Sequence, residues 1–161
     1  VVSVFTGYTR AQVAHPLDGF GVLVPQVEHR RMLGTLFSST LFPGRAPAGH
    51  VGLTTFVGGV RDAPLTQLDD PGLLRVVQSE LEHFFGAKGA PVFTHIQRWP
   101  RAIPQYTVGY QAVKQAVDET ELANPGLYLA GNYRNGVSVG DCVASGQQIA
   151  QRVASYLTRA G

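Results

Sequence analysis

The stretch from Gly126 to Gly146, GLYLAGNYRNGVSVGDCVASG, holds the residues with the clearest chemical meaning. Its apolar start at 127–130 predicts a buried strand, residues 131–136 predict a glycine-bearing turn, and a helix is expected from about Val137. A helix that begins after such a turn directs unpaired backbone N–H groups, and the positive end of its dipole, toward the end of the strand. The stretch therefore predicts a site for an anion or a carbonyl group. The alternative is a plain structural unit, because most strand–turn–helix units bind no ligand.

Other kinds of catalytic site have weaker support. We expect no metal site, because no two of the five histidines are spaced three or four residues apart and the single cysteine is distant from all of them. Val137-Ser138-Val139 does not match the GxSxG nucleophile motif. Cys142 has no histidine near it in sequence to act as a base, so we expect it to pack as a small buried residue beneath the turn.

Composition narrows the class of protein. The 161 residues are enough for one domain with a sizeable core, and the net charge of +2, without a basic run, argues against a nucleic-acid partner. The apolar runs are too short to cross a membrane. A single cysteine excludes an internal disulfide and fits a reducing compartment. We therefore expect a cytoplasmic location, with peripheral attachment to the cytoplasmic membrane as the alternative.

The N-terminal part is rich in strand signals. The predicted strands cover residues 1–5, 20–24, 33–38 and 51–57. Short turns join them, which favours an antiparallel meander. The run at 20–24 is apolar throughout, and we therefore expect a buried strand there.

From residue 69 onward, helical signals alternate with strand signals. Asp69-Asp70-Pro71 predicts a helix start and Gly86 its end, with Leu73, Val77 and Leu81 on one face. A strand is expected at 91–97, a second helix at 108–122, and a last helix at the C-terminus. The apolar face of that last helix is predicted from four residues: Ile149, Val153, Tyr156 and Leu157. Strands first and then helix–strand–helix–strand–helix make an α+β fold.

Three segments carry a family resemblance. LAGNYRNGVSVGDCVASG resembles the C-terminal flavin motif of the protoporphyrinogen oxidases, a family within the flavin amine oxidase superfamily. RWPRAIPQYTVGY, at 98–110, resembles the tryptophan and IPQY segment of that family. GFGVLVP at 19–25 and LFPG at 41–44 resemble its substrate-domain strands. The segments occur in the family's order, so the resemblance extends over essentially the whole chain.

The resemblance implies a particular domain organisation. Residues 1–98 would be part of a substrate-binding domain, and residues 99–161 would be the C-terminal part of an FAD-binding domain with a parent α/β fold. The GxGxxG turn with which these enzymes begin is absent, and the chain starts with Val1 in place of Met. We therefore expect the C-terminal portion of a larger enzyme, whose missing N-terminal half is its main partner.

The resemblance also implies binding residues, all of them toward FAD. Gly131 and Asn132 match positions near the pyrophosphate and ribityl chain, and the backbone N–H groups of 137–139 match those facing the pyrimidine carbonyl of the flavin. The implied FAD contacts are Trp99, Gly131, Asn132, Val137, Ser138 and Val139. The alternatives are a core aromatic residue for Trp99 and simple turn chemistry for the asparagine.

No residue is expected to act as a catalytic acid or base, since a flavin carries the redox chemistry itself. Asp141 is expected to support the helix dipole only. Arg98 and Arg101 are weaker candidates for pairing with substrate propionates, and pairing with carboxylates of the protein is the alternative.

The implied activity is FAD-dependent oxidation of protoporphyrinogen IX to protoporphyrin IX, with O₂ as the electron acceptor and a tetrapyrrole as substrate. Other members of the superfamily remain as alternatives: a coproporphyrinogen oxidase, an amine oxidase or a desaturase-like oxidoreductase. A third reading is an inactive fragment that self-associates as a homo-oligomer through uncovered apolar surface.

Overall fold

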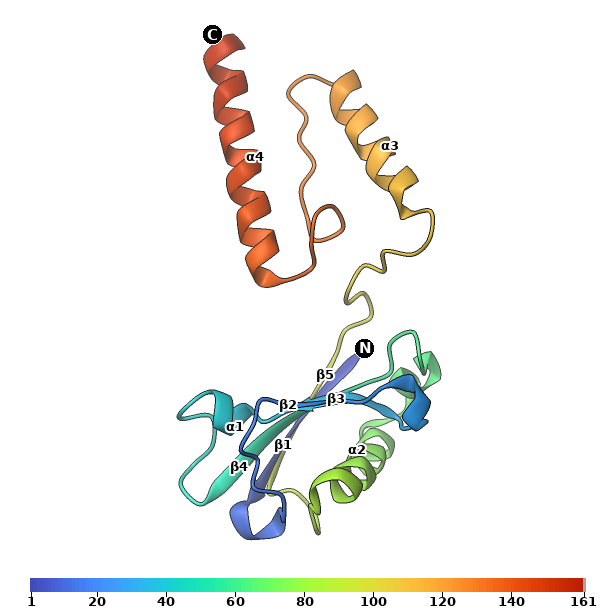
Figure 1. The fold of residues 1–161 in the computed structure, drawn as a ribbon, viewed down its shortest axis with the longest axis vertical. Helices are drawn as coiled ribbons and strands as arrows, with labels where there is room; N and C mark the ends of the chain where they lie inside the picture. Colours follow the sequence, from blue (N-terminus) through green and yellow to red (C-terminus); the bar gives the residue numbers. More distant parts are fainter. Residues whose placement is uncertain (161) are drawn as a thin grey trace. The chain divides into compact units, whose positions relative to one another are not determined.

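The computed structural model describes residues 1–160, and these form two compact units, Val1–Pro100 and Arg101 onward (Figure 1). The first unit contains the strands, and the second contains two long helices. The assignment of residues 1–98 to a substrate-binding domain and of residues 99–161 to an FAD-binding domain stays a prediction.

The first unit is built on a five-stranded antiparallel sheet with the order β2-β3-β4-β1-β5. Its strands are β1 (Val2–Thr9), β2 (Gly21–Leu23), β3 (Met32–Leu36), β4 (His50–Val57) and β5 (Phe93–Arg98). The predicted meander is wrong in one respect, because β1 lies between β4 and β5 and pairs with both. Val2, Val4 and Thr6 on one face of β1 are fully buried, which is consistent with its central position in the sheet.

Strand β2 corrects a second expectation. It was expected to be buried, but it lies at the edge of the sheet and pairs only with β3. Leu23 is 89% exposed, and the preceding Phe20 is 68% exposed. An apolar run that is only three residues long in the sheet can lie at an exposed edge as well as in a core, and its sequence pattern does not distinguish the two.

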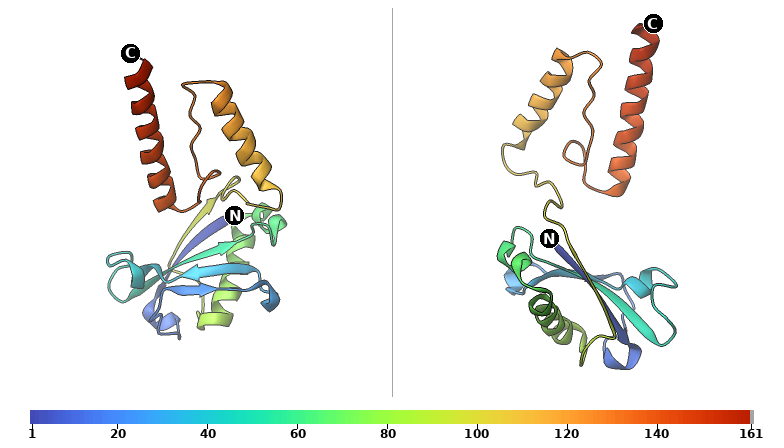
Figure 2. Two further views of the ribbon diagram at one scale, coloured as in Figure 1. Left: turned by 45° about the horizontal axis from the view of Figure 1, so that its top comes forward. Right: turned by 180° about the vertical axis from the view of Figure 1, so that it is seen from behind.

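Helix α2 (Asp70–Phe85) covers one face of this sheet, and Figure 2 shows the two layers from further directions. Its bounds follow the local signals closely. The Asp69 side chain accepts a hydrogen bond from the Gly72 N–H at 2.9 Å, and the helix ends at Gly86. Leu73, Val77 and Leu81 are fully buried against the sheet, which confirms the predicted apolar face.

Shorter elements connect the strands. They are α1 (Ser38–Leu41) and three 3-10 turns at Arg10–Gln12, Gln26–Glu28 and Ala63–Gln67. Each is too short to give a helical pattern in the sequence, so none of them was expected.

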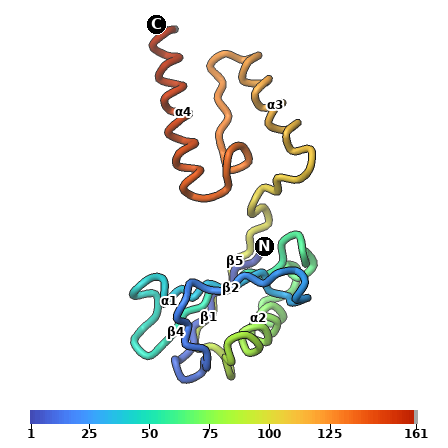
Figure 3. The backbone as a smooth tube through the Cα atoms, in the orientation of Figure 1, coloured from blue at the N-terminus to red at the C-terminus, as the bar shows by residue number. Residues whose placement is uncertain are grey.

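The second unit contains α3 (Tyr110–Ala123) and α4 (Val139–Ala160), with an extended segment between them (Figure 3). Helix α4 begins two residues later than expected. The strand predicted at 127–130 is extended but has no strand partner among residues 1–160, so that expectation is wrong for this structure. Within this segment, the backbone N–H and carbonyl of Leu129 are bound by the side chains of Glu121 and Arg134 instead of by a second strand.

The predicted apolar face of α4 is partly correct. Ile149, Val153 and Tyr156 are half-buried, but Leu157 is 64% exposed. Among the described residues from Arg101 onward, no side chain is fully buried. None of the described helices combines the length and the apolar character that a membrane span requires.

Candidate functional site

The turn from Gly131 to Gly136 is held in place by two tyrosines that precede it in sequence. The Tyr106 hydroxyl donates a hydrogen bond to the Asn132 carbonyl at 2.5 Å and accepts one from the Gly136 N–H at 3.2 Å. The Tyr110 hydroxyl donates to the Tyr133 carbonyl at 2.5 Å. These hydrogen bonds pair backbone groups of the turn that no neighbouring strand pairs.

Two glycines are required by the shape of this turn. A Cβ on Gly131, where φ is +154°, would lie 2.7 Å from the ring of Tyr133. A Cβ on Gly136, where φ is +149°, would lie 2.4 Å from the carboxyl carbon of Asp141. Only glycine leaves room for these neighbours at such backbone angles.

Helix α4 starts with a capping box formed by Ser138 and Asp141. The Ser138 hydroxyl accepts a hydrogen bond from the Asp141 N–H at 3.0 Å, and the Asp141 carboxylate accepts one from the Ser138 N–H at 3.2 Å. The N–H groups of Val139 and Gly140 have no hydrogen-bond partner among residues 1–160. Since Val139 is also 82% exposed, this end of the helix can donate hydrogen bonds to a ligand.

Cys142 lies in the first turn of the same helix. We expected a small buried residue, and this is wrong, because Cys142 is exposed. The expectation assumed a layer of protein beneath the turn, and no such layer covers it within residues 1–160.

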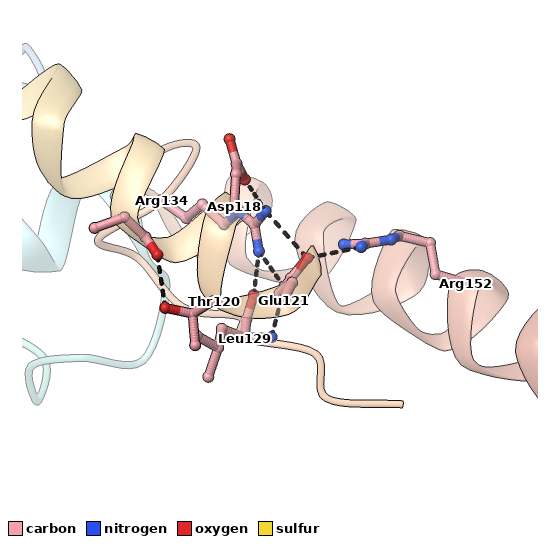
Figure 4. A network of polar contacts seen from close by, with 7 residues as sticks. Asp118, Thr120, Glu121, Leu129, Arg134 and Arg152 are labelled. Carbon is pink, nitrogen blue, oxygen red and sulfur yellow. Dashed lines mark hydrogen bonds and ion pairs between the residues drawn. The ribbon is translucent and has the colours of Figure 1, made fainter. Parts of the chain in front are cut away.

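An ionic network fixes the extended segment that leads into the turn (Figure 4). The Glu121 carboxylate accepts hydrogen bonds from the Leu129 N–H at 2.7 Å and from Arg134 at 2.5 Å. Arg134 also donates to the Leu129 carbonyl at 2.7 Å and to Asp118. Arg152 of α4 donates to the other oxygen of Glu121 at 2.7 Å. The network therefore joins α3, the extended segment, the turn and α4.

The electrostatics of Glu121 follow from these contacts. The hydrogen bond from Arg134, with smaller contributions from the Leu129 N–H and from Arg152, lowers the pKa of Glu121 from 4.5 to about 2, although burial acts in the opposite direction. The hydrogen bond to Glu121 raises the pKa of Arg134. Both groups are therefore ionised throughout the physiological range.

Taken together, the second unit presents a glycine turn followed by an exposed helix N-terminus. The absence of side chains at 131 and 136 and the unpaired N–H groups of Val139 and Gly140 fit a flavin, whose N1 and O2 region becomes negative on reduction. The Ser138 N–H is bound to Asp141, so it is less available than its two successors.

The other predicted site residues lie at the end of β5 and just beyond it. The Trp99 indole donates a hydrogen bond to the Ser3 hydroxyl at 3.1 Å, and its side chain is half-exposed. Arg98 donates to the Asp70 carboxylate at 2.6 Å and to the Leu68 carbonyl at 2.8 Å. This pairing with the protein is the alternative that the sequence left open for Arg98. Arg101 is exposed.

Sequence reasoning missed several residues that the structure brings together. Tyr106 belongs to the IPQY segment and Arg134 to the flavin motif, but neither was given a role. On the face of the sheet opposite α2, the rings of Phe5 and Phe93 meet edge to face at 6.0 Å. They line a cavity of about 310 Å³ together with Arg45 and His50. Phe5 lies within a run of apolar and β-branched residues in β1, and this run does not indicate that the Phe5 ring meets Phe93 on the opposite face of the sheet.

Comparisons with known proteins identify the family of the chain. Residues 1–154 match the model of the flavin containing amine oxidoreductase family. The chain is 44% identical over 157 residues to the mitochondrial protoporphyrinogen oxidase of Nicotiana tabacum, covering 96% of this chain and 31% of that protein. It is 27% identical over 158 residues to the coproporphyrinogen III oxidase of Bacillus subtilis, covering 98% and 34%.

A solved structure shows the same fold. The protein comes from Exiguobacterium sp. 255-15 and is described as a protoporphyrinogen oxidase. Its structure superposes on this chain with a TM-score of 0.80 at 27% sequence identity, and the match covers 94% of this chain and 34% of that one. The chain thus spans about a third of the length of these relatives. It belongs to the flavin containing amine oxidoreductase family.

Proposed function

We propose that this chain is the C-terminal part of an FAD-dependent protoporphyrinogen oxidase, which converts protoporphyrinogen IX to protoporphyrin IX with O₂ as acceptor. The observation that carries the proposal is the exposed N-terminus of α4 behind the turn 131–136, in a segment that the flavin family model matches. The 44% identity to a protoporphyrinogen oxidase supports the choice of substrate.

In this proposal, the second unit binds one side of FAD. Gly131 and Asn132 approach the pyrophosphate and ribityl chain, and the backbone of 137–139 faces the flavin ring. Because Asp141 occupies the Ser138 N–H, the strongest donors to the ring are the N–H groups of Val139 and Gly140. Trp99, which belongs to the first unit, is a separate candidate for an aromatic contact to the flavin, as the family resemblance implies. FAD bound by these residues would supply the redox chemistry, and the residues themselves would hold and orient it.

The open face of the sheet is proposed to meet the tetrapyrrole. Phe5 and Phe93 offer aromatic surface that suits a flat macrocycle, and Arg45 lies beside them at the same cavity. Arg101 is exposed and remains available for a propionate, whereas Arg98 would first have to leave Asp70.

Coproporphyrinogen is the second candidate substrate. The similarity to the coproporphyrinogen III oxidase of Bacillus subtilis extends over 98% of this chain, although the identity is lower. Coproporphyrinogen carries additional carboxylates, so an enzyme that uses it needs more cationic groups at the pocket. An amine oxidase or a desaturase-like activity remains an alternative within the same family.

The remaining alternative is an inactive chain that only self-associates. Apolar residues on the helices of the second unit are exposed, including Val113, Leu122, Val139 and Val143. A second copy or the rest of a longer protein would cover them. We expect the isolated chain to bind FAD weakly. For the complete enzyme we propose a cytoplasmic location, with peripheral attachment to the membrane as the alternative.

The first experiment is an intact mass measurement with an absorbance spectrum, followed by a turnover assay on the yellow protein. We expect a mass well above 17.3 kDa, stoichiometric FAD, and oxidation of protoporphyrinogen IX faster than that of coproporphyrinogen III. A faster reaction with coproporphyrinogen III would assign that compound as the substrate instead. A complete protein that binds no flavin would overturn the proposal, and light scattering would then test self-association.

A further inference from the structure

We propose that Tyr106 is a positioning residue for the flavin, because its hydroxyl bridges the two ends of the turn that precedes α4. This inference rests on the proposed function. It assigns a role to a side chain that makes no direct contact with the redox centre in the proposal above.

The hydroxyl of Tyr106 uses both of its hydrogen-bonding capacities on the turn. It donates to the Asn132 carbonyl at 2.5 Å and accepts from the Gly136 N–H at 3.2 Å. Neither backbone group has another hydrogen-bond partner among residues 1–160. One phenol therefore closes a loop of five residues that has no ladder hydrogen bonds of its own.

The ring of Tyr106 is itself held in place. It stacks on the ring of Tyr110 with a centroid distance of 4.7 Å and an interplanar angle of 32°. Tyr110 donates its own hydroxyl hydrogen bond to the Tyr133 carbonyl. Since Tyr110 is the first residue of α3, the helix fixes one phenol and the stacking fixes the other.

The position of the turn decides where the first N–H groups of α4 point. Gly136 lies two residues before Ser138, the residue that caps α4. A shift of Gly136 therefore moves the start of the helix and the free N–H groups of Val139 and Gly140 with it. Hydrogen-bond donors stabilise developing negative charge only when they are preorganised, so a looser turn would weaken binding of the flavin.

The variant Tyr106→Phe tests this role, because it keeps the stacking ring and removes only the hydroxyl. Tyr156→Phe is the matched control, since it also removes one phenol hydroxyl, lies in the C-terminal part of α4 and has no hydrogen-bond partner for that hydroxyl among residues 1–160. Three quantities are measured on the complete, FAD-loaded protein. They are the amide exchange rate of Gly136, the dissociation constant of FAD and the midpoint potential of the bound flavin.

We expect Tyr106→Phe to speed the exchange of the Gly136 amide and to weaken FAD binding, each by about fivefold, as the loss of one hydrogen bond implies. The midpoint potential should become more negative, because negative charge on the reduced flavin loses stabilisation. Tyr110→Phe should act in the same direction and more weakly, while Tyr156→Phe should match the wild type.

Different failures have different meanings. If Tyr106→Phe leaves both the FAD affinity and the potential at wild-type values, the inference is wrong, even if exchange at Gly136 becomes faster. The proposed function then stands, because the wild type still binds FAD. If the wild-type protein binds no FAD, the proposed function fails and the positioning role fails with it, whatever the exchange rates show.

Discussion

Glu121 and Arg134 bind each other and also hold the two backbone groups of Leu129 between them. The carboxylate accepts the Leu129 N–H, and the guanidinium donates to the Leu129 carbonyl. In a sheet, a neighbouring strand would occupy these two positions. Here an ion pair does so, and this arrangement connects the stability of the second unit to the charge of one carboxylate.

Replacing Glu121 with glutamine should therefore destabilise the protein. Only 7% of the Glu121 side chain and 12% of the Arg134 side chain are exposed. We expect a loss of about 2 kcal/mol, between the values for surface pairs and for fully buried pairs. Urea unfolding of the complete protein measures it. The control is Glu119→Gln on the exposed surface of α3, and an equal loss in both variants would contradict the special role of Glu121.

The same carboxylate predicts a pH dependence. The pKa of Glu121 is lowered to about 2 in the folded protein from an ordinary value of 4.5. A group whose folded pKa is depressed stabilises the fold above its unfolded pKa and loses this contribution as the pH falls toward the folded value. The difference in unfolding free energy between wild type and Glu121→Gln should therefore be constant above pH 5 or so and shrink as the pH falls toward about 2. Urea titrations at several pH values measure this difference, and a gap that does not change with pH would rule out the electrostatic origin.

Adding a methyl group at Gly136 should disturb the start of α4. A Cβ there would lie 2.4 Å from the carboxyl carbon of Asp141, and the backbone angle is unfavourable for alanine. We expect Gly136→Ala to cost about 2 kcal/mol through strain and loss of the capping box. Thermal unfolding followed by circular dichroism provides the measurement.

Gly146 supplies the matched control for that change. It lies within α4, and a Cβ there would meet no atom within 4 Å. Gly146→Ala should be neutral or stabilise the protein by up to about 1 kcal/mol, since alanine favours a helix. If the two alanine variants behave alike, the clash with Asp141 is not what requires glycine at 136.

Arg98 and Arg101 should respond differently to loss of their charge. Arg98 pairs with Asp70, so Arg98→Gln and Asp70→Asn should each cost less than about 1 kcal/mol of stability and leave the KM for the tetrapyrrole unchanged. Arg101→Gln should raise the KM several-fold without a change in stability. Steady-state kinetics and urea unfolding of the three variants separate these effects. A raised KM in Arg98→Gln alone would assign the propionate contact to Arg98.

Local signals in the sequence determined the elements whose start, apolar face and end all lie within one short segment. The helix at 70–85 could be predicted because its cap at Asp69, its apolar residues three and four apart and its end at Gly86 all lie within one segment. The flavin family was predicted for a similar reason, since its motif is a contiguous stretch around the turn 131–136.

Only the tertiary structure decided how distant segments meet. The place of β1 between β4 and β5 depends on burial summed over the sheet, which no short window of sequence contains. Tyr106 contacts a turn 26 to 30 residues further along the chain, and Arg98 contacts Asp70 over 28 residues. Hydrogen-bonding side chains of this kind fit many partners, and the fold alone determines which partner comes within reach.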